Sequence, residues 1–155
     1  MRRHDREVTE RAKIDEIIES CDCLRLGLKA EDGAYIVPLS FGYAPEEPAK
    51  FYFHSAMEGR KVSMIGDGAK AGFEMDSAHR LGEAELGCKH TYFFKSVIGT
   101  GFVRPVADLE EKKRALTLIM AHYRKDRAFS FTDGQARTVA VFCLTVDQMT
   151  AKEYV

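Results

Sequence analysis

The sequence lacks any surplus of basic charge: 23 Lys and Arg residues stand against 24 Asp and Glu residues in a chain of 155. General binders of nucleic acid or of anionic membranes need a basic excess to neutralise phosphate groups. The near-neutral balance therefore argues against nucleic-acid and membrane partners. Any anion that this protein binds must be neutralised by a few local side chains.

Long apolar runs are also missing. The first seven residues are mostly charged, and no apolar stretch long enough for a signal peptide or a membrane span follows them. We therefore expect a cytoplasmic protein. Its four cysteines are then expected to be reduced thiols, since a chain of this size builds a core without disulfides.

Signatures of several chemistries do not occur. The sequence has no G-x-x-x-x-G-K-[ST] phosphate loop, no G-x-S-x-G of a hydrolase, and no G-x-G-x-x-G that leads into a helix. There is no C-x-x-C pair either. The nearest alternatives are Cys21-x-Cys23 and Cys88-x-His90. Neighbouring strand residues face opposite sides of a sheet, so we expect no metal site.

The chain is expected to form a single domain, residues 1–155, with one core. Apolar residues at helical spacing predict helices at residues 9–21, starting from Thr9, and at residues 109–123, starting from Asp108. Alternating or apolar runs predict strands at residues 23–29, 35–43, 51–54, 71–75, 81–88, 93–103 and 138–146. Residues 124–134 are predicted to be a loop.

The order of these elements bears on the fold class. Strands mostly follow strands through short turns instead of alternating with helices, which disfavours a parallel sheet built from βαβ units. The pattern predicts an α+β fold that is mainly β, with an antiparallel sheet curled into a small barrel and helices flanking it.

Two cations stand where a helix would disfavour them. Ser55 and Glu58 form an S-x-x-E capping box, which predicts a short helix that begins at Ser55 and carries Arg60 and Lys61 in its first turns. The positive end of the helix dipole disfavours each cation there by a few tenths to about 1 kcal/mol. A bound anion would reverse this effect. The two residues are therefore either part of a phosphate site, with Ser55 beside them, or simply solvated charges.

Three further features each allow two interpretations. Pro38 removes a hydrogen-bond donor inside a predicted strand, which indicates either an edge strand or bulge, or a backbone turned toward a planar ligand. Gly99 and Gly101 share one face of another strand, which either opens that face to a ligand or allows the close packing of a coiled barrel. His54, at the end of an aromatic strand, is either structural or an acid–base or ligand-binding group.

Three segments, in this order and spacing, carry a family resemblance: residues 34–43 (AYIVPLSFGY), 51–61 (FYFHSAMEGRK) and 96–101 (SVIGTG). With the two longer predicted helices, nearly the whole chain resembles the FMN-binding split-barrel family related to pyridoxamine 5′-phosphate oxidase. Within that family it is most similar to the nitroimidazole-resistance reductases. The resemblance implies a six-stranded antiparallel split β-barrel that forms a homodimer, with FMN bound at the subunit interface.

The resemblance also assigns candidate site residues. Arg60 and Lys61 would hold the FMN phosphate with Ser55 nearby, and His54 would be the catalytic residue. The other cofactor-binding candidates are the backbone of Val37, Pro38, Leu39 and Ser40 along the flavin ring, Phe53 together with His54 at its flank, and Ser96, Val97, Ile98 and Gly99, contributed by the second subunit.

The implied function is that of an FMN-dependent oxidoreductase acting on a small-molecule substrate, with nitroaromatics such as 5-nitroimidazoles as candidates. The flavin would transfer the electrons, and the protein would anchor and orient it. The alternative is a non-catalytic split barrel that binds or senses flavin or haem. Pyridoxamine phosphate oxidation is not expected, because Ser40 and Phe41 stand where the oxidase carries a basic residue, and residues 146–155 do not match its substrate-binding C-terminus.

Overall fold

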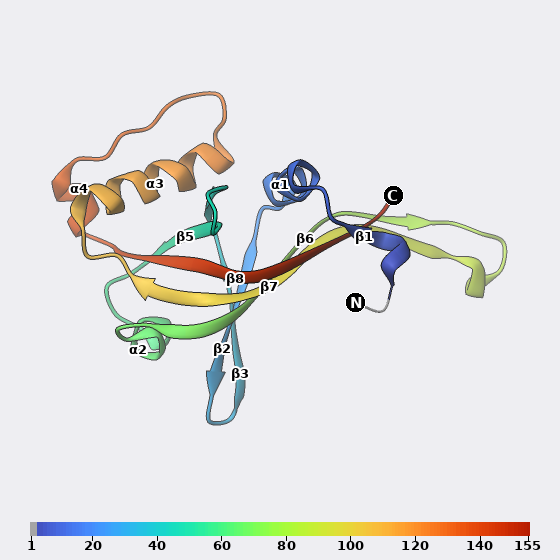
Figure 1. Cartoon of the computed structure of the whole chain (residues 1–155), viewed down its shortest axis with the longest axis horizontal. Helices are drawn as coiled ribbons and strands as arrows, with labels where there is room; N and C mark the ends of the chain where they lie inside the picture. The colour runs from blue at the N-terminus through green and yellow to red at the C-terminus, as the bar shows by residue number, and fades with distance from the viewer. Residues whose placement is uncertain (1–2) are drawn as a thin grey trace.

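The computed structural model describes residues 3–155 of the chain. This part of the chain forms one antiparallel sheet of eight strands with four α-helices packed around it (Figure 1). The strands are β1 (Glu7–Val8), β2 (Leu24–Ala30), β3 (Gly33–Leu39), β4 (Gly42–Ala44), β5 (Lys50–Ser55), β6 (Ala69–Gly82), β7 (Thr91–Pro105) and β8 (Ala140–Tyr154). The α-helices are α1 (Arg11–Ser20), α2 (Arg60–Ile65), α3 (Leu109–Tyr123) and α4 (Asp133–Arg137), and short 3-10 turns cover His4–Arg6 and Gly87–Lys89.

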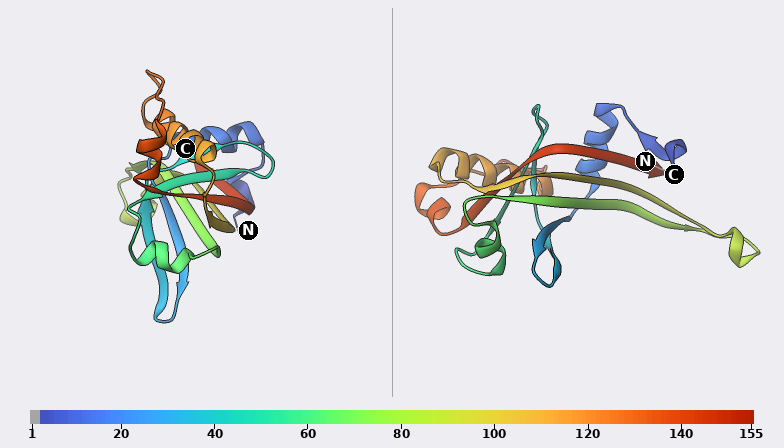
Figure 2. Two further views of the ribbon diagram at one scale, coloured as in Figure 1. Left: turned by 90° about the vertical axis from the view of Figure 1, so that its left-hand side faces the viewer. Right: turned by 60° about the horizontal axis from the view of Figure 1, so that its bottom comes forward.

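The strand order explains why the sheet curls. It runs β3-β2-β6-β7-β8-β5-β4, with β1 paired to β8, so the consecutive strands β3 and β4 lie at opposite ends of the sheet. Only Ser40 and Phe41 separate them, and the three peptide units from Leu39 to Gly42 span at most about 11 Å. The ends must therefore approach each other, as the end-on view of Figure 2 shows. Within residues 3–155 no ladder joins β3 to β4, so the barrel stays open along this line.

The predicted fold class, a mainly β α+β fold on an antiparallel sheet that forms a split barrel, is confirmed, but the sheet has eight strands and not six. The single strand predicted at residues 35–43 is wrong: it is two strands, because the chain leaves one end of the sheet at Ser40 and enters the other at Gly42. The strand predicted at residues 81–88 is also wrong, since β6 runs from residue 69 and ends at Gly82. β8 continues to Tyr154, because the long partner strand β7 pairs with it as far as Phe94.

The helix predictions are confirmed in place and partly wrong in their caps. Asp108 caps α3, and its Oδ1 accepts from the Glu111 N–H at 2.8 Å. Thr9 does not cap α1, which follows Glu10. The predicted capping box at Ser55 is wrong, since Ser55 is the last residue of β5 and its hydroxyl donates to the Ala56 carbonyl.

A short helix, α4, occupies part of the predicted loop at residues 124–134. It begins with a capping box between Thr132 and Gln135, which the sequence analysis did not predict.

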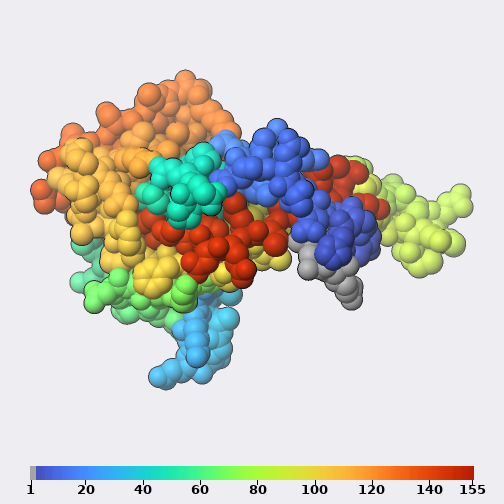
Figure 3. Space-filling model, viewed as in Figure 1, coloured from blue at the N-terminus to red at the C-terminus, as the bar shows by residue number. Residues whose placement is uncertain are grey.

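The core lies inside the curl of the sheet. Leu24, Leu26 and Leu28 of β2 point into it, as their alternation predicted, and meet residues of α1, β5, β6, β7 and β8. A second, smaller cluster lies between α3, α4 and the strands β4, β5 and β8. Two hairpins, β2–β3 and β6–β7, project from this body, one downward and one to the right in Figures 1 and 3.

Candidate functional site

The segment predicted to line a flavin ring lies at the free end of the sheet. β3 has a strand neighbour on one side only, where Pro38 is paired with Arg25 of β2. A residue without an N–H is tolerated at such an edge, so the edge-strand explanation of Pro38 is confirmed. The other side of β3 leaves backbone groups of residues 37–40 without a strand partner among the described residues, and these groups are available to a planar ligand.

The histidine and its neighbours come from β5. Phe53 is fully buried and its ring stacks on Phe142 at 5.5 Å between centroids, so only its backbone can flank a ligand. His54 is the next residue on the strand and points the opposite way, toward solvent, as strand alternation requires. Ser55 ends the strand with its hydroxyl on the neighbouring carbonyl.

The two predicted phosphate ligands open α2. Gly59, with a φ of +135°, precedes the helix, and Arg60 and Lys61 are its first two residues. Their predicted position in the first turn of a helix is thus confirmed, although the turn begins five residues later than Ser55. With six residues, α2 contributes little dipole of its own, so any anion here depends mainly on the side chains.

Lys61 is half-buried and has no carboxylate partner among residues 3–155. Burial lowers its pKa below the ordinary 10.5, and no carboxylate within the described part of the chain offsets this effect. The pKa of His54 is lowered below 6.5, first by burial and second by the charge of Lys61. The structure therefore holds a cation and a neutral imidazole within electrostatic reach of each other, an arrangement that an anion would stabilise.

Arg60 makes different contacts. Its guanidinium donates to Asp32 Oδ1 at 3.3 Å and lies over the Tyr35 ring at 4.7 Å from the centroid. These contacts tie it to the β2–β3 hairpin, and both charged side chains are exposed. A hollow of about 550 Å³ lies beside it, lined by Lys29, Ala30, Glu31, Asp32, Arg60 and Met64. The contact with Asp32 uses one N–H of the guanidinium, so Arg60 keeps donors for a phosphate.

The β7 candidates lie elsewhere in the subunit. The register runs Pro38 to Arg25, Arg25 to Glu74 and Glu74 to Ile98, so Pro38 and Ile98 share one row of the sheet with β2 and β6 between them. Three strand spacings separate them by about 14 Å. Within the chain the structure therefore brings residues 37–40 into the site region but not Ser96, Val97, Ile98 and Gly99.

The glycines of β7 pack tightly. A Cβ on Gly99 would lie 2.5 Å from the Phe73 ring, and one on Gly101 would lie 2.3 Å from the Thr145 carbonyl. The side on which a Cβ would stand is therefore filled within the chain. Gly99 also borders a hollow of about 300 Å³ beside Gln148, Met149 and Thr150, and contact of its backbone with a ligand stays a prediction. Close packing in a coiled barrel, the other interpretation of Gly99 and Gly101, agrees with these short distances. The register between β7 and β8 also shifts between Thr100 and Gly101.

An apolar outer face, which the sequence reading missed, lies between the two groups of candidates. Gly27 pairs with Gly72, and together with Ile36 they border a hollow of about 320 Å³ on the solvent side of the sheet, whose rim also holds the ion pair of Arg25 and Glu74. Ile36, Ile98 and Phe102 are 57%, 49% and 41% exposed on this face. The alternation of β2 could have revealed it, because Gly27 lies between two buried leucines and so faces outward.

Among residues 3–155, no group of three or more His, Cys, Asp or Glu side chains is arranged to hold a metal ion. In the same part of the chain, no helix is both long and apolar enough to cross a membrane.

Comparison with known proteins places the chain in a family. The profile of the pyridoxamine 5′-phosphate oxidase family matches residues 10–153. A proposed 5-nitroimidazole antibiotic resistance protein from Bacteroides thetaiotaomicron is 34% identical, with a TM-score of 0.79 over 95% of this chain and 86% of that one. None of the curated protein sequences compared with the chain matches it.

Two more distant structures share the fold. The FAD and heme binding protein from Mycobacterium smegmatis is 15% identical, with a TM-score of 0.81 over 96% of this chain and 73% of that one. The flavocytochrome Anf3 from Azotobacter vinelandii is 16% identical, with a TM-score of 0.79 over 100% and 72%. On the profile match and the 34% identity, the chain belongs to the flavin-binding split-barrel family of pyridoxamine 5′-phosphate oxidase.

Proposed function

We propose that the protein is an FMN-dependent oxidoreductase that reduces a small-molecule substrate. The observation that carries the proposal is Lys61, a half-buried cation without a carboxylate partner among the described residues, whose charge reaches His54. A phosphate group at this point would satisfy the unpaired charge. FMN offers such a group together with a ring that fits the free backbone edge of β3.

The roles of the chain's own residues follow from their positions. Lys61 binds the phosphate, joined by the N–H donors of Arg60 that Asp32 does not use. The backbone of residues 37–40 hydrogen-bonds the edge of the ring, and the flavin supplies the electron or hydride transfer. His54, with its pKa lowered, is neutral at pH 7 and can accept or pass on a proton during substrate reduction.

A homodimer with shared sites is part of the proposal. The apolar outer face exposes Ile36, Ile98 and Phe102, and such a face favours a partner surface. A two-fold partner would bring its Ser96, Val97, Ile98 and Gly99 toward residues 37–40, from which they are separated within one subunit. The cytoplasm is the proposed location.

Nitroaromatic compounds are the proposed substrate class. This rests on the 34% identical protein from Bacteroides thetaiotaomicron, which is described as a proposed 5-nitroimidazole antibiotic resistance protein. The reductant is proposed to be a reduced nicotinamide cofactor, which supplies the electrons that the flavin passes on.

The absorption spectrum of the purified protein tests flavin binding, and steady-state oxidation of NADH or NADPH with a nitroimidazole tests catalysis. We expect a yellow protein that releases FMN on denaturation and turns over. A folded protein that takes up no added FMN would contradict the whole proposal. One that binds FMN without turnover under either reductant would support instead a flavin-binding protein without catalytic activity.

A further inference from the structure

The link between β3 and β4 contains a buried backbone N–H that no strand partner can satisfy. Ser40 and Phe41 carry the chain from one end of the sheet to the other and belong to neither strand. Phe41 is completely buried, so its backbone N–H must be satisfied from outside the sheet. Because Ser40 ends the segment that we propose to line the flavin ring, whatever holds Phe41 also holds that segment.

Tyr123, the last residue of α3, supplies this partner. Its hydroxyl oxygen accepts from the Phe41 N–H at 3.1 Å and donates to the Asp22 carbonyl at 2.8 Å. Asp22 lies just before β2, and Leu24 of β2 pairs with Leu39 of β3. One hydroxyl therefore ties together the start of β2 and the end of β3. Burial raises the pKa of Tyr123, so the proton needed for the second bond is retained at neutral pH.

The neighbouring residues of α3 hold the same place. The His122 ring packs on the Phe41 ring with 4.2 Å between centroids, and its Nε2 donates to the Cys21 carbonyl at 2.7 Å. At Gly42 the helix approaches so closely that a Cβ would lie 2.5 Å from the Ile119 nitrogen. The C-terminal part of α3 thus contacts the link through a hydrogen bond, an aromatic contact and close backbone packing.

We infer that Tyr123 is a positioning residue of the flavin site. It acts through Phe41 by fixing the backbone of Pro38, Leu39 and Ser40 in the geometry that meets the ring. This inference rests on the proposed function, since it concerns how the ring is held. It assigns Tyr123 no contact with the flavin or with the substrate.

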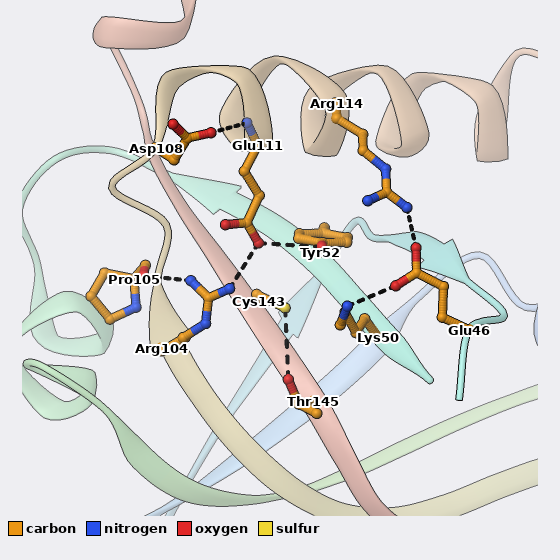
Figure 4. Close-up of polar contacts among 10 residues, drawn as sticks. All are labelled: Glu46, Lys50, Tyr52, Arg104, Pro105, Asp108, Glu111, Arg114, Cys143 and Thr145. Atoms are coloured by element: carbon orange, nitrogen blue, oxygen red, sulfur yellow. Dashed lines mark hydrogen bonds and ion pairs between the residues drawn. The ribbon is translucent and has the colours of Figure 1, made fainter. Parts of the chain in front are cut away.

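Tyr123→Phe removes the hydroxyl and keeps the ring. The matched control is Tyr52→Phe, because the buried Tyr52 also joins the sheet to α3 through one hydroxyl, which donates to Glu111 Oε1 at 3.3 Å (Figure 4). That contact lies at the opposite end of α3 from the link. Tyr52→Phe loses one structural hydrogen bond and Tyr123→Phe loses two, but only Tyr123→Phe releases the ring-lining segment.

Binding of riboflavin and of FMN is measured by fluorescence titration for both variants and for the wild type. Riboflavin has the ring without the phosphate. We expect Tyr123→Phe to weaken both ligands by the same factor, roughly two- to tenfold, the net effect of losing the one hydrogen bond that holds the Phe41 N–H. Tyr52→Phe is expected to lower the melting temperature comparably and to leave both affinities unchanged.

The outcomes separate the inference from the proposed function. If the wild type binds flavin and Tyr123→Phe binds riboflavin as tightly, or if Tyr52→Phe weakens it equally, the inference is wrong and the proposed function stands. If the wild type binds neither ligand, both fail. Should Tyr123→Phe not fold, His122→Leu, which leaves Tyr123 in place and loosens Phe41, must weaken riboflavin for the inference to hold.

Discussion

Replacing Lys61 with methionine should weaken FMN binding and at the same time leave the protein as stable as before, or more stable. Methionine keeps an unbranched apolar stem, one heavy atom shorter than lysine, and removes the charged ammonium group. Most charge removals cost stability because they leave a partner unpaired. Lys61 has no such partner among the described residues, and burial disfavours its charged form in the folded protein.

The sign of the stability effect follows from the pKa. The folded-state pKa of Lys61 lies below the unfolded value of 10.5, so below 10.5 the unfolded chain holds this proton more tightly. The charge therefore costs stability at neutral pH. A hydrogen bond to a charged group is worth about 1.5–3 kcal/mol, so losing the phosphate contact should raise the FMN dissociation constant roughly ten- to a hundredfold.

Fluorescence titration with FMN and riboflavin, together with thermal unfolding of the apoprotein, measures both effects. Riboflavin affinity should not change, since it has no phosphate. Lys113→Met is the control, because Lys113 is paired with Asp133 at 2.8 Å and its pKa is raised. It should lose a little stability and no FMN affinity. Equal weakening of FMN and riboflavin by Lys61→Met, or a marked fall in its melting temperature, would refute the reasoning.

Three further predictions concern the rest of the molecule. The pKa of His54 is below 6.5 in the folded apoprotein, so the free energy of unfolding should decline as pH falls below 6.5. In His54→Asn this pH dependence should be weaker. Urea unfolding between pH 5 and 8 measures it for both proteins, and an unchanged pH dependence would contradict the prediction. Asp108→Ala removes the cap of α3 and should cost about 1 kcal/mol in urea unfolding, whereas a loss near zero would show that water replaces the cap. Ile98→Asp places a charge on the outer face and should shift the protein from dimer to monomer in light scattering after size exclusion. The control is Leu86→Asp on the β6–β7 hairpin, where the wild-type side chain is 61% exposed against 49% for Ile98, and it should leave the dimer intact. A monomeric wild type would contradict the proposed dimer.

Local chemistry in the sequence was enough to predict much of the fold. The alternation of Leu24, Leu26 and Leu28 placed a strand and its buried face, and Asp108 marked the start of α3. Local chemistry also located several residues of the candidate site. His54 lies on strand β5 and Lys61 lies seven residues later, on helix α2, so a short stretch of chain brings them within electrostatic reach. Pro38 marked an edge strand because proline lacks an N–H.

What lies far apart in the sequence was decided only by the tertiary structure. The break at Ser40 follows from the closure of the sheet, since the two ends must meet across a two-residue link. Gly27 and Gly72 form the outer hollow because β2 pairs with β6. Tyr123 meets Phe41 across 82 positions, and no local pattern encodes such a contact. Local charge, helix capping and the alternation of apolar residues depend on near neighbours in the sequence and can be predicted from it. Strand order and the contacts of α3 with the β3–β4 link depend on which surfaces pack together.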